Sequence, residues 1–472
     1  MNGADESHRR SHMSRILFVY PNKEGYPIIP LGISVLSGIL KRHGHEVALF
    51  DVTFMIPHRF DHEARERTGT VKPVDVREYW GAGDNLDMEA EFRTLLSAFR
   101  PDVIAFSVVE NNFLCATALF RIAKETTPAL VLAGGLFPTA LPEAFIEDAN
   151  VDLICVGEGE YALAELARRL DGKEDISGIE NLIVKRGGLS IRNRLASYHT
   201  WEPLTFQDWD IFDQRHLMKP FMGKMHRTGF FELSRGCPFS CTYCLNRLNQ
   251  EIFKGLGKYN REKPIEYAIR EIEHLKKQYA LEMVFFSDEN FLAMRKERLM
   301  EFCGKYRLRV ALPFFIMTRA DTLLDEGRVK LLKDAGCVNV AMGVESGNET
   351  IRRQLLNKNI PNSVYEKAFA LCHKANLRTT ANVMIGLPFE TEDDIIETAR
   401  FCRKVEARSL SLAIFAPYHG THLRDLCIEH GFIEDRMYED IGIINHSTLT
   451  MPQLSREKIS ELYYEFNSLV YD

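Results

Sequence analysis

The sequence has no long apolar run and no surplus of positive charge. No stretch approaches the roughly 18 consecutive apolar residues that a membrane span requires, and the start, MNGADESHRRSH, has no apolar core of the secretory type. Lys and Arg number 59 against 66 Asp and Glu, for a net charge of −7, which leaves no global basic field for binding nucleic acid. We therefore expect a cytoplasmic protein with small-molecule or protein partners, no membrane span and no nucleic-acid partner.

Nucleotide-binding motifs and paired cysteines are also missing. No G-x-G-x-x-G follows the first predicted strand and no Walker motif occurs anywhere, so the sequence gives little support to nicotinamide binding. The 10 cysteines show no regular pairing, which is typical of a reducing compartment where disulfides are rare. Five of them lie within apolar segments and are expected to be core residues: Cys155, Cys303, Cys337, Cys372 and Cys402.

The N-terminal part of the chain alternates short apolar strands with helical segments. At 472 residues the chain is long enough for two or three domains. Over residues 15–171, continuous apolar runs such as ILFVY and DVIAFSV predict a parallel sheet covered on both faces. We expect a doubly wound α/β domain of five strands here, after a disordered tail over residues 1–14. A polar insertion over 55–90 has no predicted place, and 172–229, with a hairpin at NLIVKRGGLSIRN, is predicted to be a linker.

A second alternation runs from residue 230 to about 419. It contains six strand-like runs: FFELSRG, MVFFSDE, FFIMTRAD, VNVAMGVES, TTANVMIGLP and LSLAIFAP. Units of this length predict a partial (β/α)6 barrel, whose functional residues belong at the carboxyl ends of the strands. Residues 420–472 are predicted to form a helical region at the barrel mouth.

Three closely spaced cysteines follow the first of these strands, in SRGCPFSCTYCLN. Cys237, Cys241 and Cys244 stand on a loop that Gly236 and Pro238 can bend, so their thiolates can converge on one soft metal centre. A structural zinc site normally has four ligands, and no second cysteine pair is present. A four-iron cluster with three cysteines leaves one iron open, where a small molecule can bind and be reduced. The sequence therefore favours an iron-sulfur cluster over zinc.

The pattern C-x3-C-x-Y-C resembles the radical S-adenosylmethionine (SAM) superfamily, and the resemblance covers residues 230 to about 417. It implies that Cys237, Cys241 and Cys244 hold a 4Fe-4S cluster whose open iron binds SAM, and that one electron cleaves SAM to methionine and a 5′-deoxyadenosyl radical. The SAM amino group needs an acceptor and its carboxylate a cationic donor. The resemblance implies SAM contacts from the cysteine loop and the later strand ends: Tyr243, Ser287, Asp288, Glu289, Arg319, Glu345 and Ser346.

Two of these residues also have a purely structural interpretation. Glu345 could be a solvated carboxylate that a helix start stabilises, and Arg319 could pair with Asp321 at the surface. We favour SAM binding for Glu345, because the preceding AMGV run ends in the predicted barrel mouth. For Arg319 both alternatives stay open.

Glycine-rich turns follow strands of the first domain, in GGLFPTALPE and VGEGE. With the PLG start of the first helix, they resemble the flavodoxin-like cobalamin-binding domain that precedes many radical SAM barrels. Glycine backbone can lie flat against a corrin or its tail. The resemblance implies cobalamin contacts from these strand ends: Ser107, Glu110, Asn111, Gly134, Gly135, Gly157, Glu158 and Gly159. The motif D-x-H-x-x-G is absent, which implies cobalamin without a histidine ligand and with the loop Glu110 to Asn112 near its lower face.

Both halves together resemble the cobalamin-dependent radical SAM family, most often class B methyltransferases. The resemblance implies a transferase that uses a 4Fe-4S cluster, SAM and methylcobalamin to methylate an unactivated carbon or phosphorus centre. An electron donor such as flavodoxin or ferredoxin is implied as a partner. Candidate substrate-lining residues are Asn290, Asn382, Tyr418, His419 and His422.

Three alternatives use parts of the same machinery. The first is a cyclase, ring-contracting or other oxidative enzyme that uses cobalamin without methyl transfer. The second is a cobalamin-binding sensor without catalysis, which the intact cysteine set disfavours. The third is a methylthiotransferase, which would need three further cysteines in the N-terminal domain, where only Cys115 and Cys155 stand.

Overall fold

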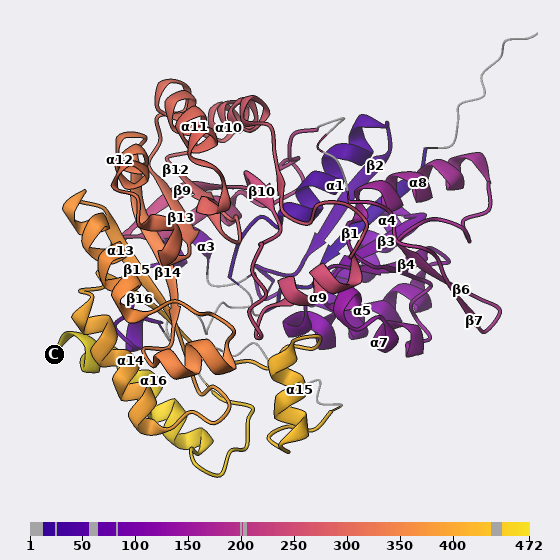
Figure 1. Ribbon diagram of the computed structural model, residues 1–472. Helices are drawn as coiled ribbons and strands as arrows, with labels where there is room; N and C mark the ends of the chain where they lie inside the picture. Colours follow the sequence, from indigo (N-terminus) through magenta and orange to yellow (C-terminus); the bar gives the residue numbers. More distant parts are fainter. Residues whose placement is uncertain are drawn as a thin grey trace, which may run out of the picture.

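Two large sheets dominate the protein. The computed structural model describes residues 13–23, 26–55, 65–81, 84–198, 201, 205–435 and 446–472. Its two seven-stranded sheets come from the two halves of the chain and lie beside each other (Figure 1). The α/β fold with an N-terminal doubly wound sheet, a partial barrel and C-terminal helices is therefore confirmed.

The first sheet has the strand order β2-β1-β3-β4-β5-β6-β7. Its first five strands are parallel, and the order 2-1-3-4-5 is that of a flavodoxin-like sheet. In β1 the four central residues of RILFVY are buried, as a strand covered on both faces requires. The bounds are β1 Arg15–Tyr20, β2 Glu46–Asp51, β3 Val103–Ser107, β4 Leu130–Gly134, β5 Leu153–Cys155, β6 Leu182–Arg186 and β7 Leu189–Arg192.

The last two strands correct the predicted linker. β6 and β7 form the hairpin expected at NLIVKRGGLSIRN, but β6 also pairs with β5 in antiparallel orientation. Leu182, Ile183 and Val184 are buried, so this hairpin extends the first sheet instead of connecting the domains. A hairpin is a local pattern, whereas the edge it joins depends on tertiary contacts.

Helices cover both faces of the first sheet (Figure 1). The insertion over 55–90 includes the start of α4, where Asp87 caps the helix by accepting from the N–H groups of Glu89 and Ala90. Trp80, at the end of α3, is buried and donates its indole N–H to the carbonyl of Met218 at 2.9 Å, which ties the insertion to the second domain. The bounds are α1 Leu31–Arg42, α3 Arg77–Trp80, α4 Met88–Phe99, α5 Phe113–Thr126, α6 Leu136–Ala140, α7 Pro142–Glu147 and α8 Gly159–Gly172.

The second sheet has the order β16-β15-β14-β13-β12-β9-β8. Its strands β9, β12, β13, β14, β15 and β16 are parallel to one another, as the predicted partial barrel requires. β8, inside the predicted linker, is an antiparallel edge strand that forms a hairpin with β9. The bounds are β8 Met218–Phe221, β9 Lys224–Phe231, β12 Met283–Phe286, β13 Phe314–Thr318, β14 Cys337–Glu345, β15 Arg378–Ile385 and β16 Ser409–Ile414.

The two faces of the second sheet differ. Phe286 and Ile316 pack into the core under the outer helices, whereas Phe285 and Phe315 point the other way, because neighbouring side chains alternate along a strand. The outer helices surround this sheet in Figure 1. The helix bounds are α9 Leu245–Ile252, α10 Ile265–Tyr279, α11 Lys296–Arg309, α12 Glu326–Asp334, α13 Asn362–Lys374, α14 Glu392–Lys404, α15 His422–Glu429 and α16 Arg456–Tyr471.

Short elements complete the description. β10 Ser234–Arg235 and β11 Arg261–Glu262 form a two-stranded ribbon beside the cysteine loop. The 3-10 turns are η1 Glu110–Asn112, η2 Gln214–Leu217, η3 Phe291–Ala293 and η4 Ala320–Leu323, and η5 Ile351–Leu355 is a π-helical turn.

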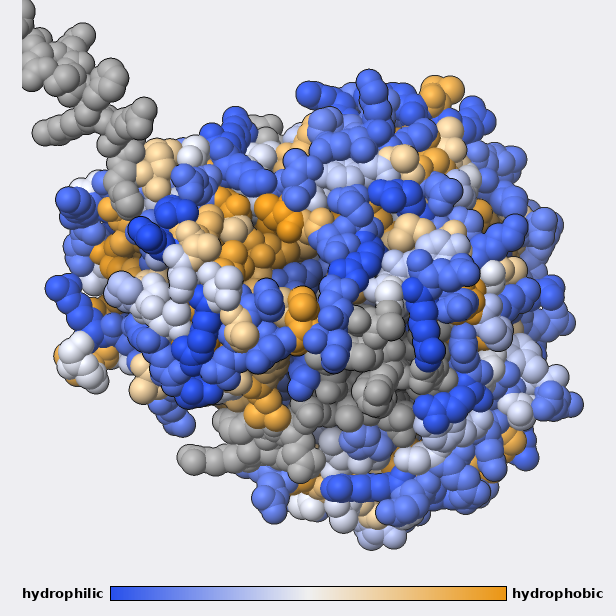
Figure 2. All heavy atoms as spheres, turned by 180° about the vertical axis from the view of Figure 1, so that it is seen from behind, coloured by the Kyte–Doolittle hydropathy of each residue, from blue (hydrophilic) through white to orange (hydrophobic). Residues whose placement is uncertain are grey.

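The surface also differs between the halves. Seen from behind, hydrophobic side chains gather on the half that carries the first domain, while the other half is largely hydrophilic (Figure 2). No helix within the described ranges has the length and apolar content of a transmembrane segment.

Candidate functional site

The cysteine loop connects β10 to α9. Gly236 has a φ of +82° and an added Cβ there would lie 2.5 Å from the carbonyl oxygen of Tyr259, so only glycine fits this turn. Cys244 directly precedes α9. Cys237, Cys241 and Cys244 are all partly exposed, whereas the cysteines of the second-domain core are buried.

Hydrogen bonds hold this loop in place. The Gln250 side chain donates to the carbonyls of Cys237 and Phe239, at 2.8 and 3.1 Å. On the other side, the Thr242 hydroxyl donates to the carbonyl of Leu355 at 2.6 Å. The loop is therefore fixed by protein contacts from α9 and from the turn after β14.

The cysteines lie close enough to influence one another. Burial raises the pKa of Cys237 to about 11, with smaller contributions from the neighbouring Cys244 and Cys241. Among the described residues, no three His, Cys, Asp or Glu side chains are arranged to hold a single metal ion. A cluster fits this arrangement better, since each thiolate then binds a different iron. The donor set thus suits an iron-sulfur cluster.

Two carboxylates follow β12 and have different surroundings: Asp288 lies in the core, and Glu289 lies near the cysteines. Asp288 is fully buried and accepts from the N–H of Leu233 and the hydroxyl of Ser234. Burial raises its pKa to about 7. Glu289 instead adds negative potential at Cys237 and Cys244, so its carboxylate lies on the cysteine side.

Glu345, at the end of β14, is not a solvated carboxylate. Its φ is +64°, and it is 9% exposed. It accepts from the Tyr243 hydroxyl at 3.1 Å and from Nζ of Lys358 at 2.7 Å. Tyr243 lies between two of the cysteines, so Glu345 is tied directly to the cysteine loop.

Arg319 and Ser346 have partners within the barrel. Arg319 pairs with Asp321 at 2.8 Å, the structural alternative foreseen from the sequence, yet it also lies 3.5 Å from the ring centroid of Phe239 in the cysteine loop. Ser346 is fully buried, and its hydroxyl lies 3.4 Å from that of Thr398 on α14. Arg319 thus faces the site, whereas the Ser346 hydroxyl faces the outer helix.

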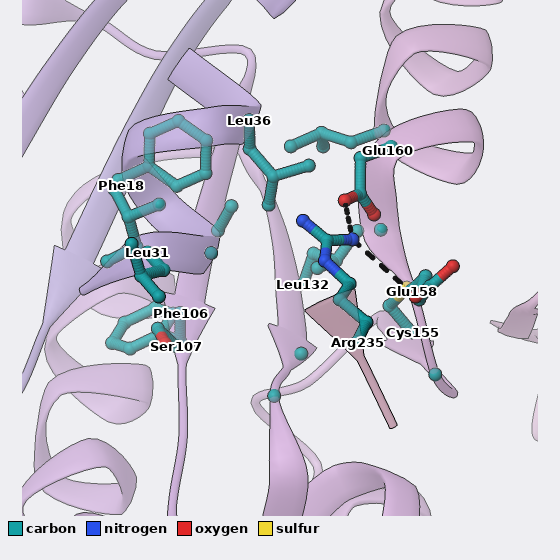
Figure 3. A pocket seen from close by; sticks show the side chains of 18 of the residues that line it. Phe18, Leu31, Leu36, Phe106, Ser107, Leu132, Cys155, Glu158, Glu160 and Arg235 are labelled. Carbon is teal, nitrogen blue, oxygen red and sulfur yellow. Dashed lines mark hydrogen bonds and ion pairs between the residues drawn. The ribbon is translucent and has the colours of Figure 1, made fainter. Parts of the chain in front are cut away.

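A cavity of about 310 Å³ lies at the carboxyl ends of β1, β3, β4 and β5, beside α1 and α8. Apolar side chains such as Phe18, Leu36 and Leu132 form much of its wall (Figure 3). Its lining includes six of the residues predicted to contact cobalamin: Ser107, Gly134, Gly135, Gly157, Glu158 and Gly159. A cavity of this size and polarity fits a flat bicyclic group such as the nucleotide base of cobalamin.

Two of these glycines are required by close contacts. Gly135 has a φ of +116° and an added Cβ would lie 2.6 Å from the Val108 carbonyl oxygen. Gly157 has a φ of +85° and an added Cβ would lie 2.2 Å from the ring of Phe253, just after α9. A phenyl ring of the second domain therefore fills the space that a side chain at position 157 would need.

The sequence did not reveal the ion pairs at the cavity mouth. Arg235, from β10, reaches across to the first domain and pairs with Glu160 at 2.5 Å and Glu158 at 3.5 Å (Figure 3). Its Nε also pairs with Glu232 at 2.9 Å. Arg261 of β11 pairs with Glu158 as well. The sequence around Arg235, SRG, does not distinguish an arginine that pairs with the other domain from one at the surface.

The remaining candidates lie at loops and at the inner face. Glu110 and Asn111 contact His419 and Tyr418, from the segment after β16. Asn290 accepts from the Thr318 hydroxyl at 2.7 Å. Asn382 shares the face of Gly343, and His422 is exposed at the start of α15.

Two family models match the chain. The model of the radical SAM superfamily matches residues 231–402, and the model of the B12 binding domain matches residues 78–167. The chain belongs to the cobalamin-dependent radical SAM family. The 4Fe-4S cluster, SAM and cobalamin are accordingly its cofactors, as the sequence predicted.

Curated relatives of this family member include methyltransferases and a cyclase. An uncharacterized methyltransferase of Pyrococcus horikoshii, PH0819, is 24% identical over 82% of each chain. The cytidylyl-2-hydroxyethylphosphonate methyltransferase of Streptomyces wedmorensis is 22% identical over 93% of this chain and 85% of the relative. The anaerobic magnesium-protoporphyrin IX monomethyl ester cyclase of Rubrivivax gelatinosus is 25% identical over 86% of this chain and 68% of the relative.

A solved structure shares the fold. The radical SAM methyltransferase TsrM of Kitasatospora setae superposes with a TM-score of 0.66 at 18% identity. The match covers 88% of this chain and 76% of that chain. At this identity the likeness supports the architecture of both domains and nothing finer.

Proposed function

We propose that the protein is a methyltransferase that acts on an unactivated carbon or phosphorus centre. The observation that carries the proposal is the position of Arg235. Its guanidinium lines the cavity of the first domain, and its backbone is two residues before Cys237. In this proposal the cavity and the cysteine loop hold the two cofactors side by side. Methyl transfer needs this proximity because a substrate radical must reach its methyl donor before it is quenched.

The cysteine loop has the role of holding the cluster. When bound, the cluster supplies the electron that cleaves SAM, and cobalamin supplies the methyl group. In this proposal Cys237, Cys241 and Cys244 are the ligands. The hydrogen bonds from Gln250 and Thr242 keep the loop in its bound shape beforehand, which reduces the ordering needed when the cluster binds.

Carboxylates around the loop have the role of binding SAM. We assign Glu289 and Glu345 as acceptors for its amino group, because both lie beside the cysteines or Tyr243. Arg319 binds the SAM carboxylate, with Phe239 holding the guanidinium in place. Ser287 follows β12 on the face of Phe285 and completes the set. We leave Ser346 out, because its hydroxyl faces Thr398.

The cavity has the role of binding the tail of cobalamin. Ser107, Gly134 and Gly159 line it from three strand ends, and Glu158 closes its mouth through Arg235. Glu110 and Asn111 act at the junction with the barrel.

A cyclase with the same cofactors is the second candidate, since the Rubrivivax cyclase aligns over 86% of this chain. Product counting separates the two. Methyl transfer yields deoxyadenosine and S-adenosylhomocysteine in equal amounts, whereas cyclisation yields deoxyadenosine alone.

The test uses anaerobically reconstituted protein with SAM, cobalamin, a flavodoxin or ferredoxin reducing system and extracts of the source cells. Both SAM products and a mass shift of one methyl group in one extract component are expected. Deoxyadenosine without S-adenosylhomocysteine would overturn the proposal in favour of the cyclase. The absence of both products with every extract would overturn both candidates.

A further inference from the structure

One buried lysine of the second domain has no polar partner among the residues that the structure describes. Lys219 in β8 is 6% exposed, and its Nζ accepts or donates no hydrogen bond within the described part of the chain. The amine is surrounded by aromatic rings instead, at 4.6 Å from the Tyr26 centroid, 5.5 Å from Phe230 and 5.8 Å from Trp80.

Strand register places this amine at the end of an aromatic wall. Lys219 lies opposite His226 on β9, and Phe230 lies on the same face four residues later. Phe230 is the register partner of Phe285 on β12, which pairs in turn with Phe315 on β13. Their ring centroids are 5.3 and 4.8 Å apart. The three rings form a continuous wall on the inner face of the half-barrel, and all three remain partly exposed there.

Other buried cations of the barrel are paired. Lys358 contacts Glu345 and Lys263 contacts Glu271, each at 2.7 Å, and Arg352 donates to three oxygen acceptors. An unpaired buried amine is unfavourable, so the isolation of Lys219 favours a partner beyond the described residues.

The surroundings also determine the charge of the amine. Burial alone lowers the pKa of Lys219 well below that of an ordinary lysine, and no charged side chain in the described residues contributes. Two titratable side chains are placed beside the amine: Tyr26, whose ring lies 4.6 Å away, and His226, its register partner on β9. An arriving anion would favour the ammonium form, so binding would be coupled to proton uptake.

We propose that Lys219 anchors an anionic group of the substrate, a carboxylate or a phosphate, while a flat apolar part of the substrate lies along Phe230, Phe285 and Phe315. Aromatic rings offer a large contact area for such a body, and an ammonium supplies the charge-assisted bond. The proposal rests on the proposed function, because it makes the inner face of the half-barrel the substrate site.

The test measures small aromatic anions on the reconstituted holoenzyme. Benzoate and phenylphosphonate serve as probes, with benzamide as the neutral control, and calorimetry is run at pH 8 in two buffers of different ionisation enthalpy. We expect both anions to bind more tightly than benzamide and to take up a proton. Lys219→Met should weaken anion binding by about tenfold or more, the usual effect of losing a hydrogen bond to a charged group, and should abolish the proton uptake.

Lys224→Met is the matched control, because Lys224 is exposed on the same hairpin. It should leave binding and proton uptake unchanged. Lys219→Met should also unfold at a higher denaturant concentration than the wild type, since an apolar side chain of similar length relieves the unpaired amine. If Lys219 instead stabilised the fold, Lys219→Met would unfold at a lower denaturant concentration than the wild type.

The proposal is overturned if the anions bind no better than benzamide, or bind equally to Lys219→Met. The wild-type preparation is assayed in parallel for deoxyadenosine formation. Loss of SAM cleavage with intact anion binding would count against the proposed function alone, and SAM cleavage without anion binding would count against Lys219 alone.

Discussion

Glu110 and His419 are bonded twice, although 309 positions separate them in the chain. The Glu110 carboxylate accepts from the backbone N–H of His419 at 2.8 Å and contacts its Nδ1 at 2.5 Å. The side chains are 6% and 8% exposed. The Tyr418 side chain is hydrogen bonded to Asn111 next to them. This contact joins the turn after β3 in the first domain to the segment after β16 in the second, and so ties the two domains together.

Replacement of Glu110 by Ala should allow SAM cleavage to continue while methyl transfer is impaired. Loss of the contact should lower the free energy of unfolding by about 1.5 to 3 kcal/mol. Product analysis should show more deoxyadenosine per S-adenosylhomocysteine than in the wild type, because SAM cleavage persists while methyl transfer is misaligned. Glu143→Ala, at an exposed surface pair with Arg192, is the control. An unchanged product ratio in Glu110→Ala would contradict the positioning role.

A large side chain in the first-domain cavity should weaken the binding of cobalamin. Ser107 lines the cavity at the end of β3, and a phenyl ring at this position would occupy space within the 310 Å³. We expect Ser107→Phe to retain at most about a fifth of the cobalamin affinity, since overpacking costs about 1 to 3 kcal/mol. The visible absorbance after dialysis against cobalamin reports binding. Ser97→Phe, exposed on α4, should bind normally, and normal binding by both variants would place cobalamin elsewhere.

The cysteines should be needed for the cluster but not for the fold. Replacing Cys237, Cys241 and Cys244 together by Ala should abolish deoxyadenosine formation and remove iron and sulfide from anaerobic preparations. Cobalamin binding and the unfolding midpoint should stay near the wild-type values, because the loop is also held by Gln250 and Thr242. A triple variant at the buried Cys337, Cys372 and Cys402 should show the reverse, a loss of stability with the iron retained. Undiminished SAM cleavage without the loop cysteines would refute the cluster assignment.

The Lys358 to Glu345 pair should contribute strongly to stability. Lys358 is buried with its partner, and removal of one member leaves an uncompensated buried charge. Lys358→Met should therefore lower the free energy of unfolding by about 3 to 5 kcal/mol, measured by urea denaturation. Lys374→Met breaks a pair of the same 2.7 Å length whose members are 67% and 65% exposed, and should cost under about 1 kcal/mol. Equal losses would show that burial of the first pair is unimportant.

Glu390 should make stability depend on pH. It is fully buried, and burial raises its pKa to about 8. Between about pH 5 and pH 8 the folded protein therefore keeps a proton that the unfolded chain has lost, so the free energy of unfolding falls as the pH rises. This group contributes a slope of up to about 1.4 kcal/mol per pH unit, which Glu390→Gln should remove. Asp393→Asn, exposed on α14, should leave the slope unchanged, and an identical slope in both variants would contradict the prediction.

Local pattern was sufficient to predict most elements. The apolar run ILFVY becomes β1 with one residue added, and the run DVIAFSV contains β3 Val103–Ser107. The cysteine loop could also be predicted, because its three cysteines lie within eight residues of one another in the sequence. The sequence did not predict the sheet edges that β6 and β8 join, since such pairing depends on residues distant in sequence.

The site was predictable only where the chemistry lies in a short motif. Tyr243 and Glu345 were both named as SAM neighbours, but the bond that joins them spans 102 positions. Lys219 and Arg235 carried no signal at all, because a single cation in MKPF or SRG looks like any surface residue. Their importance arises from burial against the other domain, which is a property of the folded chain.

The contact between Phe253 and Gly157 restricts which first domains can be combined with this second domain. α9 begins after Cys244 and ends at the residue before Phe253, so a side chain added at Gly157 would push this helix and the last cysteine with it. A chimera that takes its first domain from a relative must therefore bring glycine at this position or a smaller side chain opposite it. The two domains are therefore matched in shape at this contact.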